Sequence, residues 1–386
     1  MIINFIHIIE LVFYTITAIS VLYLFFFAIL SVNEKHIIYK EAKKKHKILV
    51  LFPAYKEDLV IINSIEEFIK QDYPKDKFDV LVISDQMTEE TNNKLTDLSA
   101  EVLTANYKNS SKAKALQYAT KSKIDIEYDI VVILDADNTV EKDFLNQINN
   151  AYYSGCKAIQ AHRIAKNIDT EMALLDAVSE EINNSIYRRG HIRLGLSSAL
   201  IGSGMAFDFT WFKKNVFLLH SAGEDKELEV LLLRQGVYID YLSWVLVYDE
   251  KTRKESTFYN QRRRWIAAQY HTVKRTIKEL PKAIMDGNWD YTDKIFQWLI
   301  FPRIIIWGIT FCFAIGLLFV NWVWAIKWWI AFIFIIYTFA LAIPDFLVDK
   351  KLKNTLKRLP IIFILMIINL FRIKGADKEF IHTKKG

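Results

Sequence analysis

The stretch VVILDADNTV at residues 131–140 runs from an apolar core segment directly into acidic side chains. Four apolar residues are followed by Asp135 and Asp137, with one alanine between them. Burying a charge is costly unless it is paired or binds a cation, so a strand core has no use for two carboxylates. We therefore expect this strand to end at a binding site.

The sequence upstream of this stretch alternates between two kinds of segment. Strand-like runs are short and rich in β-branched residues, and the segments between them have helical spacing and length. The strand-like runs are ILVLF (48–52), VLVIS (80–84), EVLTA (101–105) and IVVIL (130–134), and the helical segments are 57–70, 88–98 and 111–122. This alternation predicts an α/β fold with a mostly parallel, Rossmann-like sheet covered by helices.

Polar side chains follow three of the predicted strands. Tyr55 and Glu57 follow the first strand, Asp85 follows the second, and Asp135 and Asp137 follow the fourth. Ligands of such sheets bind beyond the carboxyl ends of the strands, so we expect these side chains to line one site.

The Asp-x-Asp pair has two interpretations. It can hold Mg²⁺ or Mn²⁺, because these hard cations prefer oxygen ligands and often share them with substrate phosphates. Alternatively, Asp135 and Asp137 cap a helix that begins near Glu141, although Thr139 is better placed for that role.

Uncharged apolar segments lie at both ends of the chain. Residues 11–32 are long enough to cross a bilayer, as either an anchor or a cleaved signal peptide, and the lack of a basic start favours the anchor. Residues 304–320 and 328–344 are also uncharged and predict two more spans. Residues 359–371 are apolar but too short to span comfortably, so we expect an interfacial or re-entrant helix there.

The distribution of lysine predicts the orientation in the membrane. Basic residues crowd 35–47 and 350–358, whereas only Lys327 lies between the two C-terminal spans. The positive-inside rule therefore places residues 33–300 and the C-terminal tail in the cytoplasm, with a bacterial inner membrane as the expected location. These flanks explain the net charge of +6, and we expect no nucleic-acid partner.

Two further motifs complete a recognisable set. HSAGEDKELEVLLLRQG (220–236) places Glu224 and Asp225 at the start of a predicted amphipathic helix, and QRRRWIAAQ (261–269) lies just before the membrane. Together with Asp85 and the Asp-x-Asp pair, they resemble the inverting family 2 glycosyltransferases, particularly the membrane-embedded branch that includes cellulose, chitin and hyaluronan synthases. The resemblance implies a GT-A glycosyltransferase domain flanked by transmembrane helices.

The resemblance also implies roles for individual residues. The donor-binding residues would be Tyr55, Glu57, Asp85, Lys114, Asp135 and Asp137, with Asp137 and Asp135 as ligands of Mg²⁺ or Mn²⁺ on the diphosphate of a UDP-sugar. Asp225 would be the catalytic base, with Glu224 the next candidate. The residues that hold the diphosphate and the acceptor would be Gly202, Ser203, Gly204, Gln261, Arg264 and Trp265.

The C-terminal sequence FIHTKK (380–385) resembles a gating loop that folds over the bound donor. Phe380, Thr383 and Lys385 are its matching residues, and a plain basic terminus is the alternative. The expected organisation is an anchor (1–32), a catalytic domain (33–255), a segment with the Gln-x-x-Arg-Trp motif and interfacial helices (256–300), two spans (301–345) and a basic tail region (346–386).

The sequence leaves the acceptor open. The first expectation is β-linked polysaccharide synthesis for the cell envelope or for export. Three spans are few for a private polysaccharide channel, so a homo-oligomer or an export partner would then be needed. The second is transfer of a single sugar to a membrane lipid, such as a ceramide-type glycolipid, and the third is an inactive subunit that binds a nucleotide sugar.

Overall fold

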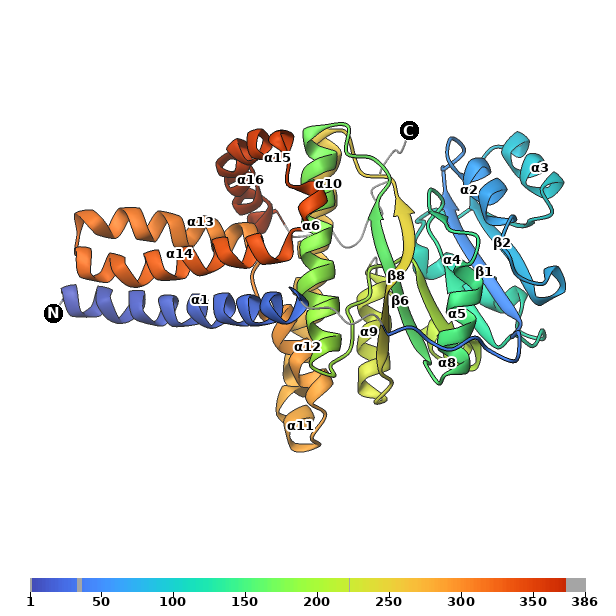
Figure 1. Cartoon of the computed structure of the whole chain (residues 1–386), viewed down its shortest axis with the longest axis horizontal. Coiled ribbons are helices and arrows are strands. Elements are labelled where there is room, and N and C mark those ends of the chain that lie inside the picture. Colours follow the sequence, from blue (N-terminus) through green and yellow to red (C-terminus); the bar gives the residue numbers. More distant parts are fainter. Residues whose placement is uncertain (1, 33–36, 222, 373–386) are drawn as a thin grey trace.

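The structure is a computed structural model that describes residues 2–32, 37–221 and 223–372. The expected gating-loop residues Phe380, Thr383 and Lys385 lie outside these ranges. An α/β body lies at one end of the molecule and long apolar helices extend from the other, with several helices across the junction (Figure 1).

The α/β body is built on one mixed sheet. Within the described residues its strands are β1 (Ile48–Tyr55), β2 (Phe78–Asp85), β3 (Glu101–Ala105), β4 (Ile130–Ile133), β5 (Thr139–Val140), β6 (Ala158–Ala165), β7 (Met205–Asp208) and β8 (Ile239–Asp249). The order is β3-β2-β1-β4-β7-β6-β8-β5. The first four are parallel, as predicted, whereas β7 runs antiparallel to both β4 and β6.

Helices cover both faces of this sheet. They are α2 (Ile61–Phe68), α3 (Glu89–Asp97), α4 (Lys112–Ser122), α5 (Phe144–Tyr153) and α8 (Phe209–Asn215). Side chains of β1 alternate between the two faces: Val50 and Phe52 join one core cluster, and Leu49 and Leu51 join the other. The alternation of strand-like and helical segments therefore predicted this half of the fold correctly.

One local prediction is wrong. The helix after the Asp-x-Asp pair, α5, begins at Phe144, and Asp143 occupies its N-cap position. Thr139 instead belongs to β5, where it pairs with Tyr248 of β8. Neither Asp135 nor Asp137 is therefore placed to cap this helix.

The junction is made of helices that follow the first part of the sheet. They are α6 (Glu171–Asn184), a π-helical turn (Ser185–Gly190), α7 (His191–Arg193), α9 (Glu224–Arg234), α10 (Glu255–Thr276), α11 (Leu280–Met285) and α12 (Trp289–Leu299). In Figure 1, α6 and α10 stand between the sheet and the long apolar helices, roughly at right angles to the latter.

The apolar part contains α1 (Ile2–Val32), α13 (Arg303–Gly316), α14 (Trp322–Ala342), α15 (Lys350–Thr355) and α16 (Leu359–Phe371). In the described ranges, three helical segments are long and apolar enough to cross a membrane: His7–Val32, Trp322–Ala342 and Lys350–Phe371. The predicted span at 304–320 meets this criterion only as a bent pair, Trp289–Leu299 with Arg303–Phe319, which turns by 56°.

The length argument against a third C-terminal span is wrong, because residues 350–358 extend the helix to 22 residues. Figure 1 nevertheless shows α15 and α16 nearly end-on, across the direction of α1, α13 and α14. Ile362 and Met366 of α16 pack with Ile266 of α10 and Ile305 of α13. An interfacial helix stays a prediction, which now rests on direction and packing.

Candidate active site

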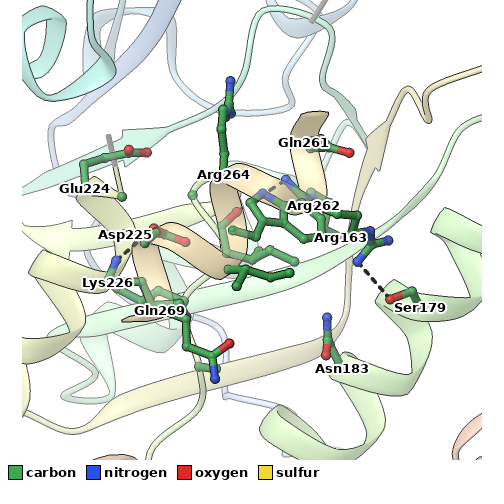
Figure 2. Close-up of a pocket in the computed structure, with 18 of the residues that line it drawn as sticks. Arg163, Ser179, Asn183, Glu224, Asp225, Lys226, Gln261, Arg262, Arg264 and Gln269 are labelled. Carbon is green, nitrogen blue, oxygen red and sulfur yellow. Dashed lines mark hydrogen bonds between the residues drawn. The ribbon is translucent and has the colours of Figure 1, made fainter. Parts of the chain in front are cut away.

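A single cavity of about 690 Å³ runs from the sheet to the apolar helices. Figure 2 shows part of its lining, with Glu224 and Asp225 on α9 and with Gln261, Arg262 and Arg264 on α10. We call one end the sheet end, defined by Tyr55, Glu57, Asp85, Asp135 and Asp137. We call the other the apolar end, defined by Ile304, Phe339, Ile343, Ile362 and Met366.

The sheet end gathers the acids predicted from strand ends. Tyr55 and Asp85 are the paired last residues of β1 and β2. The Asp85 side chain is buried and accepts a hydrogen bond from the backbone N–H of Tyr107 at 3.5 Å. Because β1, β2 and β4 are parallel neighbours, their carboxyl ends meet at one edge, as the sequence predicted.

Asp135 and Asp137 are held in different ways. Asp135 pairs with the Lys112 ammonium and lies 3.8 Å from Arg163 Nη1. Asp137 is buried, and its carboxylate accepts hydrogen bonds from the Glu250 N–H at 2.9 Å and from Asn138 Nδ2 at 3.4 Å. The backbone thus fixes Asp137, while Asp135 shares its charge with cations.

The lysine that enters the cavity is Lys112, not the predicted Lys114. Lys112 is the first residue of α4, and its Nζ donates to Asp135 and, at 2.7 Å, to the Gly202 carbonyl. Lys114 is exposed, and its Nζ donates to the Asn109 carbonyl at 2.6 Å instead. Two residues along a helix correspond to a rotation of about 200°, so these side chains point in opposite directions.

Sequence reasoning also missed Arg163 and Asp249. Arg163 is a buried cation on β6 that pairs with Glu180 at 2.6 Å, and Asp249 ends β8 and accepts from Lys251 at 2.8 Å. Lys251 also pairs with Glu180. The strand-end rule applied to Asp135 would have found Asp249 in VLVYDE (245–250).

The acid pair lies at the N-terminus of α9, between the two ends of the cavity. Glu224 Oε1 lies 3.8 Å from Lys112 Nζ, and Asp225 Oδ1 accepts from the Lys226 N–H at 2.8 Å. Burial raises the pKa of Glu224 to about 7, with Lys112 opposing the rise and Asp225 adding to it. Such a pKa is close to the range in which a carboxylate works well as a general base.

The predicted acceptor turn is only partly in the cavity. Gly202 lines it with φ of +87°, a conformation that favours glycine, and an added Cβ would lie 3.7 Å from Glu224 Oε1. Ser203 is fully buried, and a Cβ on Gly204 would meet Val247 Cγ2 at 2.9 Å. Ser203 and Gly204 therefore pack against the sheet instead of lining the cavity.

The motif on α10 reaches the cavity from the junction. Gln261, Arg264 and Trp265 all line it. Burial lowers the pKa of Arg264, and the nearby carboxylates of Glu224, Asp135 and Asp225 oppose that change, so its guanidinium lies in the field of these acids. Arg262 stacks on the Trp265 ring, with 4.4 Å from Cζ to the ring centroid.

The donor set fits a metal that is shared with a diphosphate. In the described part of the chain, no group of three or more His, Cys, Asp and Glu residues converges as a metal site. Mg²⁺ and similar cations are usually bound by one or two carboxylates together with substrate phosphates. Asp137 and Asp249 meet at Asn138, whose Nδ2 donates to both at 3.4 and 3.3 Å. These buried carboxylates fit such a cation.

The family is shown by comparison with known proteins. A family model described as glycosyltransferase like family 2 matches residues 46–268. The match covers more than half of the chain, so the chain belongs to glycosyltransferase family 2. A solved mannosyltransferase from Pyrobaculum calidifontis, in complex with GDP-Man and Mn²⁺, is 16% identical, with a TM-score of 0.55 over 94% of this chain and 98% of that one. The fold is accordingly a mixed, Rossmann-type GT-A sheet.

Two curated relatives match this chain over only part of their length. The probable glycosyltransferase YdaM of Bacillus subtilis (strain 168) is 19% identical over 249 residues, which cover 62% of this chain and 59% of that protein. A Methanococcus voltae protein is named dolichyl N-acetyl-alpha-D-glucosaminyl phosphate 3-beta-D-2,3-diacetamido-2,3-dideoxy-beta-D-glucuronosyltransferase. It is 24% identical over 203 residues, which cover 49% of this chain and 62% of that protein. The chain thus spans about three fifths of these relatives.

Proposed function

We propose that this chain is a membrane-bound inverting glycosyltransferase that moves one sugar from a UDP-sugar to a lipid-linked acceptor. One observation carries the proposal: a continuous cavity joins the carboxyl ends of the parallel strands to the apolar helices, with Glu224 and Asp225 between them. A donor and an acceptor that enter from opposite ends would meet at these acids.

The sheet end suits the donor. Tyr55, Glu57 and Asp85 would hold the uridine, as the family resemblance implies, and Asp137 would hold the metal together with Asp135 or the neighbouring Asp249. A divalent cation at this place neutralises charge on the diphosphate. Lys112 adds a cation from the chain itself, which reaches the cavity wall at Gly202.

The acid pair suits the proton transfer. An acceptor hydroxyl attacks the anomeric carbon, a new C–O bond forms as the bond to the diphosphate oxygen breaks, and UDP leaves with the bonding electrons. Asp225 would take the hydroxyl proton, with Glu224 as the next candidate. Lys112 and Arg264 would offset the charge that builds on the leaving group.

The apolar end favours the lipid acceptor over the growing polysaccharide. Ile304, Ile343 and Ile362 line it, and such side chains suit a hydrocarbon tail better than the hydroxyl groups of a glycan. The Methanococcus relative is named for a dolichyl-linked sugar phosphate, which is an acceptor with this combination of parts. A ceramide-type lipid would share the tail but lack the phosphate.

The test is transfer by the purified protein in detergent with extracted membrane lipids and a panel of labelled UDP-sugars. We expect a lipid-soluble labelled product, no UDP release in EDTA, and recovery with Mn²⁺ or Mg²⁺. Asp137→Ala should lose activity. A water-soluble polymer as the product would favour the polysaccharide function, and no product with any donor would favour the inactive subunit. Full activity in chelator would remove the metal assignment.

A further inference from the structure

Arg303, at the start of α13, carries a guanidinium nitrogen that has no hydrogen-bond partner among the described residues. Its Nη2 donates to the Ser179 carbonyl at 3.1 Å and to Ser179 Oγ at 3.4 Å. Its Nη1 is buried and has no hydrogen-bond partner in the described parts of the chain. No carboxylate of those parts pairs with Arg303, whose guanidinium carbon instead lies 5.8 Å from the Tyr187 ring centroid and whose charged neighbours are Arg262 and Arg188. A buried cation without an anion is costly, which suggests that a ligand supplies one.

A second arginine converges on the same serine. Arg262 Nη1 donates to Ser179 Oγ at 3.1 Å, and its Nη2 pairs with Asp176 at 2.6 Å. The neighbouring acids of α6 are already shared as well: Glu180 pairs with Arg163 and Lys251, and Glu181 pairs with His162 and Arg189. The region around Ser179 therefore keeps an excess of positive charge.

A third arginine adds to this excess. Arg188 Nε donates to the Ala199 carbonyl at 3.0 Å and its Nη1 donates to Asn184 Oδ1 at 2.7 Å, and both acceptors are uncharged. Arg188, Arg262 and Arg303 all line the cavity. Ser179 lies on α6, across the cavity from α10 (Figure 2).

The arginine cluster, formed by Arg188, Arg262 and Arg303, lies between an apolar and a polar part of the cavity. Arg303 is followed by Ile304, and the apolar end of the cavity begins beside it. On the other side, Arg262 lies between Gln261 and Arg264 of the predicted acceptor motif. Guanidinium groups match phosphate oxygens in geometry and charge, whereas the apolar end suits a hydrocarbon tail.

We infer that Arg303, Arg262 and Ser179 bind the phosphate of a phosphorylated lipid acceptor whose hydrocarbon tail occupies the apolar end of the cavity. This inference rests on the proposed function and narrows its acceptor to lipids that carry a phosphate. Arg303 provides the unpaired donor, Arg262 provides a second charge, and Ser179 holds both guanidinium groups in place.

The experiment measures ligand binding, so that it does not depend on transfer. Farnesyl phosphate, farnesol and inorganic phosphate are titrated separately into the full chain in a phosphate-free maltoside detergent, with calorimetry as the readout. We expect farnesyl phosphate to bind well and the other two far more weakly. Arg303→Gln should weaken farnesyl phosphate about tenfold or more, since a charged hydrogen bond contributes about 1.5–3 kcal/mol. Arg358→Gln is the matched control, because Arg358 pairs with Glu171 outside the cavity and its loss should change nothing.

Equal affinity of the parent and Arg303→Gln for farnesyl phosphate overturns the inference, and so does equal binding of farnesol or of inorganic phosphate. UDP binding in the presence of Mn²⁺, measured on the same samples, checks the fold of each variant. It also separates the two proposals, because its absence from the parent would refute the proposed function whatever the lipid does. Should Arg303→Gln fail to fold, a diazirine-bearing farnesyl phosphate analogue is photolysed with the parent protein. Labels on the helices that carry the arginines or line the apolar end (α6, α10, α13, α14 and α16) support the site, and labels confined to the rest of the chain refute it.

Discussion

The two ends of the cavity differ in whether their charged side chains are paired within the protein. At the sheet end, buried cations and acids are paired within the chain: Lys112 with Asp135, and Arg163 with Glu180. Beside the apolar end, Arg303 has no acidic partner among the described residues. Internal pairs fix side chains before a ligand arrives, whereas an unpaired charge gains its partner only on binding. The first end is thus preorganised, and the second depends on its ligand.

The largest expected effect is at the acids between the two ends. Asp225→Asn removes the proposed base while it keeps shape, so transfer should fall by about 10²- to 10⁴-fold. UDP affinity should barely change, because the donor contacts lie at the sheet end. Single-turnover transfer beside UDP calorimetry measures both, with the exposed Asp97→Asn as control. Near-parental transfer would move the base to Glu224.

The next largest effect is expected at the sheet end, where two lysines of α4 can be compared. Lys112→Met removes charged hydrogen bonds to Asp135 and Gly202, and should lower kcat/KM by about 10- to 100-fold. Lys114→Met removes an exposed lysine that donates to Asn109, and should stay within about twofold. Steady-state kinetics decide between them. A larger loss for Lys114 would restore the prediction made from sequence.

A smaller effect is expected at the apolar end. Ile343→Ala removes three carbons from a partly buried side chain that lines the cavity. With about half of this surface covered by the tail, at about 0.8 kcal/mol per buried CH₂, the acceptor KM should rise by about tenfold. The donor KM should stay constant. Ile336→Ala, an exposed position on α14, serves as the control. An unchanged acceptor KM in Ile343→Ala would indicate that the tail does not occupy this end.

The smallest effect is a dependence on pH. The pKa of Glu224 is raised to about 7, so this carboxyl loses its proton as the pH rises through about 7. Its new negative charge should strengthen Asp225 as a base, so kcat/KM should rise by less than about tenfold over that range. Measurements of kcat/KM from about pH 5.5 to 8.5 should show this rise in the parent and no such rise in Glu224→Gln. If kcat/KM still rises with pH in Glu224→Gln, the rise comes from the titration of another group.

The same pKa shift has a consequence for stability. The folded state binds the Glu224 proton more tightly than the unfolded state does, since the folded pKa lies above the ordinary value of 4.5. The contribution of Glu224 to the free energy of unfolding is therefore full below about pH 4.5 and declines as the pH rises to about 7.

Local sequence patterns predicted the first half of the sheet because each strand there is a short buried run next to a helix of matching length. They failed for β6, β7 and β8, where β7 runs antiparallel between β4 and β6. Such a reversal depends on partners far apart in the chain, and no local periodicity encodes it. Arg163 on β6 was missed for this reason, whereas Asp249 at the end of β8 could have been found with the strand-end rule.

The sequence by itself determined the alternation of strands and helices, the acids at strand ends, the apolar segments and the membership of the motif set in one family. Only the tertiary structure decided which lysine enters the cavity, because side-chain direction on a helix depends on the face that packs. It also decided that Arg303 has no acidic partner within the residues that the structure describes. Pairing of charges is a property of three-dimensional neighbours, and the composition of a segment does not determine it.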